Sequence, residues 1–316
     1  SKVRSRIVAD QLVKLIKEAD HVVIMGHRMS DLDAIGSAEG VLRICKICDV
    51  PAVIAVRRDA TLAGSLINAL IAAGQEDDFI DPKGALPIIS QRTLCIVVDT
   101  YQLGLVESRE ILEKCGKVAV IDHHRKGVGF IEKADLVCHE PYASSASELV
   151  TEFLQYVGDR DDKPNRIEAE GLLSGIMLDT RDFTLHTGVR TFEAAAALRR
   201  YGAETEHVRQ LFDVSMVEYT TKARLVSEAQ MYRGCAITVS GEVAPEARVA
   251  IAQAANDLLT IQNVEASFVA VQVGGGVNIS ARSLGAVNVQ VIMESLGGGG
   301  HQTMAAAQLK HITPEA

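Results

Sequence analysis

The sequence lacks an apolar run of the roughly 20 residues that a membrane-spanning helix needs. Its first six residues carry charges, and no apolar stretch of the kind found in a secretory leader follows them. The six cysteines are scattered over 316 residues, which is not the dense disulfide framework of small secreted domains. We therefore expect a protein of the reducing cytoplasm, in which this segment itself makes no membrane contact.

Positive charge is also scarce. The sequence has 32 Lys and Arg against 41 Asp and Glu, which gives a formal net charge of -9. Proteins that bind long nucleic acid use Lys and Arg to neutralise its phosphates, so we expect no tight binding to a long polymer. A small phosphate ester stays compatible with this composition, because bound metal ions can supply local positive charge.

The length and the hydrophobic fraction of 47% are sufficient for two domains with large cores. Short apolar runs that alternate with helical segments predict a doubly wound, mostly parallel α/β sheet, with strands at 21–25, 52–56, 93–98 and 117–121. A smaller α/β domain with a mixed sheet is expected to follow. The predicted boundaries are a metal-binding domain at 1–190, a helical connector at 191–230 and the smaller domain at 231–316.

Two clusters of Asp and His follow predicted strands. His27, Asp31 and Asp33 come after one apolar run, and the triplet Asp122, His123 and His124 comes after another. Open α/β sheets bind ligands at the carboxyl ends of parallel strands. Clusters of His and Asp at one sheet edge can hold two hard or borderline divalent metal ions.

Taken one at a time, the Asp and His residues that follow the predicted strands, Asp99 after 93–98 among them, also have simpler interpretations. Asp31 could cap the following helix, Asp99 could be a turn residue, and a lone His123 could be a hydrogen-bonded core histidine. Several loops would then need polar residues at the same sheet edge for unrelated reasons. The joint pattern therefore favours a metal site.

Five segments, in order, resemble the motifs of the DHH phosphoesterase family with its associated DHHA1 domain. The triplet 122–124 gives that family its name, and the glycine-rich run before His301 resembles the DHHA1 signature. The five segments are Gly26–Asp33, Val97–Thr100, Ile121–Arg125, Gly175–Thr180 and Gly297–His301.

The resemblance implies a ligand set for two divalent metal ions, and Mn²⁺ is the expected metal. It implies that Asp99 bridges the two ions and takes part in catalysis. Asp122 would orient a neighbouring group, and His124 would face the scissile phosphate. The implied metal ligands are His27 and Asp31 for one ion, Asp33, His123 and Asp179 for the other, and Asp99 for both.

The resemblance further implies a substrate-binding role for the second domain. Glycines let backbone N–H groups approach a phosphate, although they also terminate helices. The guanidinium of an Arg suits a pair of phosphate oxygens, although a lone strand Arg is more often solvated. The implied phosphate-binding residues are Arg282, Gly298, Gly299, Gly300 and His301.

Local strings around His27 and Arg282 resemble the catalytic part of the GdpP-type branch, whose members hydrolyse cyclic di-AMP. The expected substrate is therefore a small cyclic dinucleotide, cleaved to linear pApA. An oligoribonuclease that acts on pApA or very short RNA is the alternative, and a nonenzymatic nucleotide sensor is a further one. The resemblance is compatible with a homodimer, and with this chain being the cytoplasmic part of a larger membrane-anchored protein.

Overall fold

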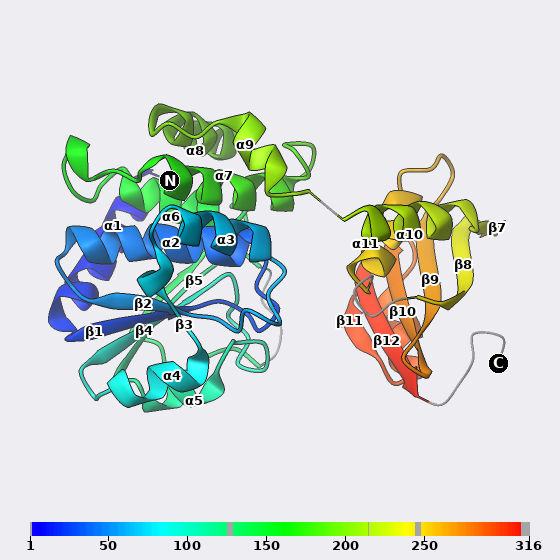
Figure 1. The fold of residues 1–316 in the computed structure, drawn as a ribbon, viewed down its shortest axis with the longest axis horizontal. Helices are drawn as coiled ribbons and strands as arrows, with labels where there is room; N and C mark the ends of the chain where they lie inside the picture. Colours follow the sequence, from blue (N-terminus) through cyan, green and yellow to red (C-terminus); the bar gives the residue numbers. More distant parts are fainter. Residues whose placement is uncertain (1, 125–128, 214, 244–247, 311–316) are drawn as a thin grey trace. The chain divides into compact units, whose positions relative to one another are not determined.

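The computed structural model describes residues 2–124, 129–213, 215–243 and 248–310 (Figure 1). The chain divides into two units, Ser1–Phe212 and Asp213–Ala316. Each unit contains one six-stranded sheet. The predicted α/β class is confirmed for both.

The sheet of the first unit is entirely parallel, with the strand order β3-β2-β1-β4-β5-β6. All six residues of β4 are buried, and the residues 94–98 form the uninterrupted apolar run that is typical of a strand covered on both faces. The strands are β1 (His21–Met25), β2 (Ala52–Ala55), β3 (Phe79–Ile80), β4 (Thr93–Val98), β5 (Lys117–Asp122) and β6 (Leu136–His139). The four predicted strands are present, and the short strands β3 and β6 extend the sheet at its two edges.

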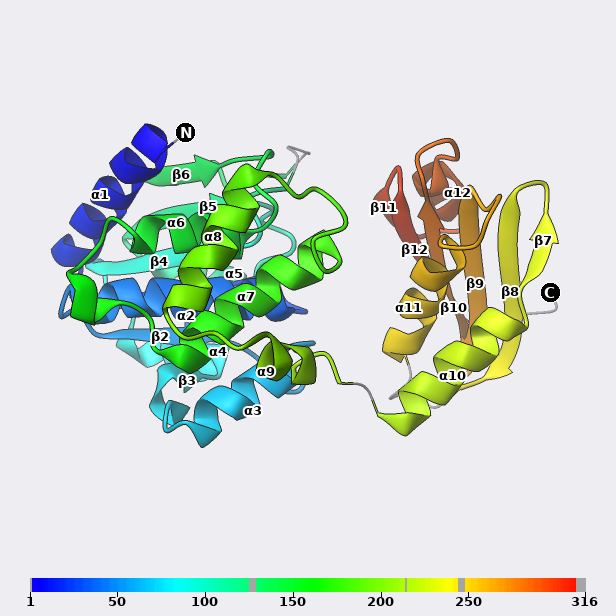
Figure 2. The ribbon, with the colours of Figure 1, turned by 90° about the horizontal axis from the view of Figure 1, so that it is seen from above.

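Helices cover both faces of this sheet (Figures 1 and 2). The larger core contains residues of α1, α2, α3, α6 and α7, and the smaller core on the opposite face contains residues of α4 and α5. These helices are α1 (Lys2–Glu18), α2 (Leu32–Ile47), α3 (Gly64–Ala72), α4 (Pro82–Ala85), α5 (Arg109–Lys114), α6 (Ala146–Leu154) and α7 (Arg166–Thr180).

The strand order changes direction at β1. The chain runs outward from β1 through β2 to β3, and it returns to the other side of β1 with β4, β5 and β6. A doubly wound sheet binds ligands at such a switch point, beyond the carboxyl ends of the strands. The polar clusters predicted from the sequence follow β1, β4 and β5, which are neighbours at this point.

The sheet of the second unit is mixed, with the order β11-β12-β10-β9-β8-β7. Only the β8–β9 pair is parallel, and the other pairs are antiparallel. The strands are β7 (Gln230–Tyr232), β8 (Cys235–Glu242), β9 (Ala266–Val273), β10 (Gly276–Ser283), β11 (Gly299–His301) and β12 (Met304–Lys310). Strands β9 and β10 form an antiparallel hairpin, and the residues 305–309 lie within β12.

The predicted connector, residues 191–230, supplies helices to both units. Helices α8 (Val189–Arg200) and α9 (Thr205–Gln210) contribute Ala194, Leu198 and Val208 to the core of the first unit. Helix α10 (Met216–Ser227) contributes Leu225 to a core of the second unit, together with α11 (Arg248–Leu258). Helix α12 (Val289–Ser295) packs on β12 through a further apolar cluster.

Candidate metal centre

His27 and Asp31 lie in the segment that joins β1 to α2. Asp31 is the N-cap of α2, where its Oδ1 accepts hydrogen bonds from the amides of Asp33 and Ala34 at 3.0 and 3.1 Å. Its Oδ1 is also 3.8 Å from His27 Nε2. Asp31 therefore caps the helix, as its simpler interpretation expects, and the same carboxylate also faces His27.

Asp99 directly follows β4 and lies between two histidines. Its Oδ2 is 3.4 Å from His27 Nε2, and its Oδ1 is 3.4 Å from His123 Nε2. The residue is 3% exposed and has a φ of 58°, in the left-handed region that a non-glycine residue rarely adopts. Its amide donates to the carbonyl of Ile121 at 2.9 Å, which fixes this conformation.

His123 is the meeting point of the second group of side chains. Its Nε2 lies 3.0 Å from Asp179 Oδ2 and 3.9 Å from Asp33 Oδ2. Asp179 comes from the last turn of α7, and Asp33 from the first turn of α2. Two helices and the loop after β5 therefore place three potential ligands at one edge of the sheet.

The described residues contain three groups that could hold a metal ion, and Asp99 belongs to all three. Within each group the potential ligand atoms lie within 4.8 Å of one another. The groups are Asp99, His123 and His124; Asp33, Asp99, His123 and Asp179; and His27, Asp31 and Asp99. The structure thus brings all six predicted ligands together, with one oxygen of Asp99 facing each histidine of the predicted set.

The donor atoms fit divalent cations. Asp99 Oδ1 and His123 Nε2 are buried and have no hydrogen-bond partner among the described residues, although His123 Nε2 is close to Asp179. Buried polar atoms normally have partners, so unpaired ones indicate that something else satisfies them. Four carboxylates and two imidazoles without a thiolate are the donor set expected for Mn²⁺ or a similar ion.

The mutual charges of these groups shift their pKa values. Burial lowers the pKa of His27, but the hydrogen bonds and charges of Asp31 and Asp99 outweigh it and raise that pKa to about 10. Burial, together with the charge of Asp99, raises the pKa of Asp179 to about 6. These shifts reflect carboxylates that lie close together and favour a nearby positive charge.

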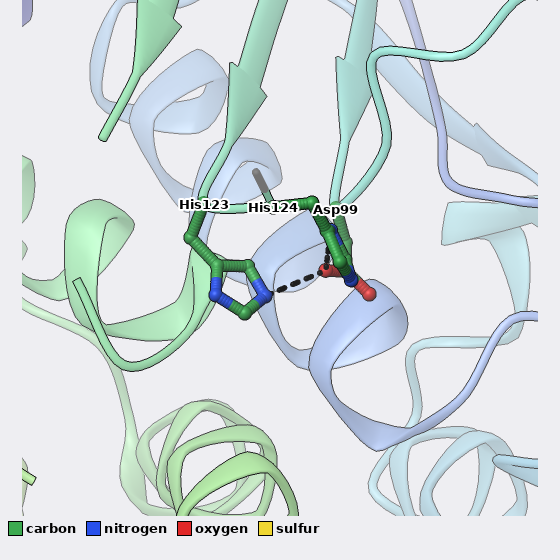
Figure 3. A group of neighbouring side chains, drawn as sticks. All are labelled: Asp99, His123 and His124. Atoms are coloured by element: carbon green, nitrogen blue, oxygen red, sulfur yellow. Dashed lines mark ion pairs between the residues drawn. The ribbon is translucent and has the colours of Figure 1, made fainter. Parts of the chain in front are cut away.

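Asp122 and His124 form a separate pair beside Asp99. His124 Nδ1 lies 2.8 Å from Asp122 Oδ1. It also lies 3.7 Å from Asp99 Oδ1, and Figure 3 shows the ion pairs of this carboxylate with His123 and His124. Asp122 is fully buried, whereas the His124 side chain is 53% exposed. Because a carboxylate accepts, His124 Nδ1 donates, and Nε2 is left for other partners. Arg125, the last residue of the motif, lies outside the described residues.

One contact of the site was not anticipated from the sequence. The amides of Ala146 and Ser147, at the start of α6, donate to the two oxygens of Asp33 at 2.7 and 2.9 Å. Ser145 caps this helix, and the spacing of Ser145 and Glu148 marks its beginning in the sequence. That signal locates the helix end, but it does not reveal which carboxylate its amides hold.

The predicted phosphate-binding residues all lie in the second unit. Arg282 is on β10, and its Nε donates to Asn256 Oδ1 of α11 at 2.9 Å. The glycine run ends α12 and forms β11, so it serves the helix-terminating role as well. A cavity of about 520 Å³ on this unit is lined in part by Gly297, Gly298 and Ser280. His301 is in β11.

The glycines differ in why a side chain is excluded. A Cβ on Gly298 would be 2.2 Å from the carbonyl oxygen of Ala306, and one on Gly300 would be 2.4 Å from that of Met304. A Cβ on Gly299 would meet nothing within 4 Å. Close approach of β11 to β12 therefore explains two of the glycines, and Gly299 has no packing reason to lack a side chain.

Among the described residues, no helix combines the length and the apolar character that crossing a bilayer requires. The six cysteines are free thiols.

Comparison with protein families gives two matches. Residues 21–176 match the DHH family, N-terminal domain, and residues 243–316 match the DHHA1 domain. The DHH match contains five of the six clustered Asp and His residues, and the DHHA1 match contains the glycine run.

Individual relatives align over almost the whole chain. It is 46% identical over 318 residues to the cyclic-di-AMP phosphodiesterase GdpP of Geobacillus thermodenitrificans, and 42% identical over 318 residues to the cyclic-di-AMP phosphodiesterase PdeA of Listeria monocytogenes. Each alignment covers 99% of this chain and 48% of the relative, so the chain spans about half the length of either.

A solved structure shares the fold. An exopolyphosphatase-related protein from Bacteroides fragilis superposes with a TM-score of 0.82 and 21% sequence identity, over 98% of this chain and 93% of that one. At this identity the likeness concerns the fold alone.

Proposed function

Because the chain belongs to the DHH family and carries a DHHA1 domain, we propose that it is a metal-dependent phosphodiesterase that hydrolyses cyclic di-AMP to linear pApA. The proposal is supported by the names of the relatives from Geobacillus and Listeria, which share 46% and 42% identity with this chain. The structural observation that carries it is the position of Asp99 between His27 and His123.

We assign the six clustered residues to two metal ions. His27 and Asp31 would hold one ion, Asp33, His123 and Asp179 would hold the other, and Asp99 would contact both through its two oxygens. Two divalent ions supply positive charge for the transferring phosphoryl group and the leaving oxygen. Manganese suits this mixture of imidazole and carboxylate, and its identity is part of the proposal.

His124 is the group suited to move a proton. Partial burial lowers its pKa, but the hydrogen bond to Asp122 and the charge of Asp99 outweigh this and raise the pKa. The protonated imidazole is thus favoured, while Asp122 holds Nδ1. We propose that Nε2 donates its proton to the ribose oxygen that leaves when water is added across the phosphodiester bond.

The second unit would bind the substrate through Arg282, His301 and the glycines 298–300. A cyclic dinucleotide carries two phosphates, and Arg282 offers a planar pair of donors for phosphate oxygens. Gly299 supports this role, because nothing in the packing explains its missing side chain. The net charge of -9 disfavours long polymers and is compatible with a small substrate.

The activity of the whole protein is likewise a proposal, since the chain spans about half of each relative. We propose that it is the cytoplasmic catalytic part of a larger membrane-anchored protein. Homodimer formation stays a prediction.

One assay tests the proposed function. The purified protein with Mn²⁺ is offered cyclic di-AMP, cyclic di-GMP, pApA and short RNA in parallel, and products are separated by chromatography. We expect pApA to accumulate from cyclic di-AMP before any AMP is formed. Rapid formation of AMP without a pApA phase would favour the short-RNA branch, and a preference for cyclic di-GMP would contradict the base assignment. Metal-dependent turnover of any of these substrates would exclude the sensor.

A further inference from the structure

His139, the last residue of β6, lies against two loops of the metal centre. In the sheet it is paired with Asp122 of β5. Its Nε2 is hydrogen-bonded to the backbone carbonyl of His124, and its ring meets that of Tyr101 edge to face, with the centroids 5.5 Å apart and the planes at 83°. His139 belongs to none of the sequence motifs, and no function has been assigned to it above.

The hydrogen bond determines the form of the His139 ring. A carbonyl oxygen only accepts, so His139 Nε2 must carry a proton. The bond anchors the backbone of His124, and the side chain of this same residue faces Asp122 and Asp99. Because the His124 ring is 53% exposed, packing against neighbours restrains it only in part, and its backbone anchor and the bond to Asp122 must orient it.

The contact with Tyr101 connects the same ring to a second loop. Tyr101 is 5% exposed and follows Asp99 by two residues. His139 therefore touches the loop after β5 through a hydrogen bond and the loop after β4 through an aromatic contact. Farther along the chain, Ala146 and Ser147 hold Asp33. The segment from β6 to the start of α6 thus supports three of the loops and helix ends that carry the site.

We propose that His139 is a positioning residue, and that its hydrogen bond to the His124 carbonyl holds His124 for proton transfer to the leaving oxygen. The inference rests on the proposed phosphodiesterase function. His139 does not belong to any of the groups that could hold a metal ion, so its effect should appear in the chemical step and leave metal binding unchanged.

Two substitutions separate the hydrogen bond from the aromatic contact. His139→Phe keeps a ring beside Tyr101 and removes the donor, whereas His139→Gln keeps an N–H donor near the position of Nε2. We expect kcat to fall about 3- to 10-fold in His139→Phe, the size expected from one lost hydrogen bond, with KM unchanged. His139→Gln should recover most of this loss. Tyr142→Phe is the matched control, because Tyr142 is 93% exposed in the same segment and should behave as wild type.

Two readouts do not depend on turnover. Mn²⁺ affinity, measured by calorimetry, should be the same in the wild type and both variants. Long-range ¹H–¹⁵N spectra of the wild type with Mg²⁺, which is diamagnetic, should show His139 protonated at Nε2. The ring nitrogens of His124 should shift in His139→Phe and return toward their wild-type positions in His139→Gln.

Several results would overturn the proposal. It is wrong if His139→Phe keeps the wild-type kcat, if both variants lose activity equally, or if the loss follows weaker metal binding. Failure of the proposed function looks different, because the wild type itself would then hydrolyse none of the phosphodiesters. If the wild type hydrolyses none of these substrates, or if His139→Phe does not fold, the wild-type spectrum is the deciding measurement. A His139 ring without a proton on Nε2 cannot donate to the His124 carbonyl, and the proposal would then be wrong.

Discussion

Gly175 of α7 lies directly against the carboxylate of Asp33. A Cβ added to Gly175 would stand 2.6 Å from Asp33 Oδ1 and 2.3 Å from Ser147 Oγ. The absence of a side chain therefore lets α7 approach the carboxylate that the amides of α6 hold from another side. In this way Gly175 fixes the distance between α7, which carries Asp179, and α2, which carries Asp33.

We predict that Gly175→Ala damages the metal centre. In most helix interiors an Ala is more stable than a Gly, by roughly 0.5–1 kcal/mol. Here the added methyl group should instead destabilise the fold by about 1–3 kcal/mol, and metal occupancy should fall because Asp33 is displaced. Gly64→Ala is the control, since a Cβ there meets nothing within 4 Å. Unfolding curves and elemental analysis provide the measurements, and a Gly175→Ala protein with full metal content would contradict the prediction.

Asp99→Asn should remove most of the metal and nearly all of the turnover. Asn keeps the size of the side chain and tolerates the left-handed conformation at φ 58°, so the fold should change little. The substitution removes the negative charge that faces both His27 and His123. Circular dichroism checks the fold, and calorimetric titration with Mn²⁺ checks the site. Retention of two bound ions at wild-type affinity would show that Asp99 is no bridge.

His27→Ala and His123→Ala should each weaken one metal site more than the other. The two histidines lie on opposite sides of Asp99 and belong to different groups of potential ligands. We expect a titration with Mn²⁺ to show two sites in the wild type and one tight site in each variant. The double variant should bind neither ion tightly. Loss of both sites in either single variant would indicate one metal ion shared by all the ligands.

Stability at alkaline pH should depend on Glu39. This side chain is 1% exposed, and neither carboxylate oxygen has a hydrogen-bond partner. Burial, followed by the charges of Asp78 and Glu168, raises its pKa from 4.5 to about 8. Folding therefore favours the protonated carboxyl group of Glu39. The stability that this group contributes to the folded protein is complete below about pH 4.5 and is lost as the pH rises through 8.

The test of this prediction compares urea unfolding of the wild type and Glu39→Gln at pH 6 and pH 9. From pH 6 to pH 9 the free energy of unfolding of the wild type should fall by about 2–3 kcal/mol more than that of the variant, because Gln has no proton to release. Equal losses in the two proteins would mean that Glu39 is already ionised at pH 6.

Arg282→Ala should weaken substrate binding about tenfold or more, because a charge-assisted hydrogen bond contributes about 1.5–3 kcal/mol. Metal content should not change, since the residues proposed as metal ligands belong to the first unit. Affinity for a nonhydrolysable cyclic di-AMP analogue gives the measurement. An unchanged affinity would exclude Arg282 from the site.

Gly299→Val provides an independent test of the glycine run. A Cβ at this position would meet none of the described residues within 4 Å, so the fold should tolerate a side chain, whereas a Cβ on Gly298 would stand 2.2 Å from the carbonyl oxygen of Ala306 in β12. If backbone amides of this run bind a phosphate, Gly299→Val should weaken substrate binding without lowering the melting temperature. Wild-type affinity in this folded variant would reduce the glycine run to a structural element.

Local sequence patterns indicated four of the six strands of the first sheet, the α/β class and the donor types of the site. An unbroken apolar run such as 94–98 is typical of a strand that is buried on both faces, and this is why β4 and the polar residue that follows it were predictable. The order of the motifs along the chain also indicated the family. These are properties of neighbouring residues, which the sequence displays directly.

Only the tertiary structure decided which atoms meet. Asp33 and Ser147 are separated by 114 residues, and their contact depends on how α2, α6 and α7 pack together. The division of the two Asp99 oxygens between His27 and His123 depends on the order of β1, β4 and β5 and on a backbone conformation that no local pattern displays. Such contacts arise when elements distant in sequence are packed against one another, so the sequence supplied the ligands and the packing gave them their geometry.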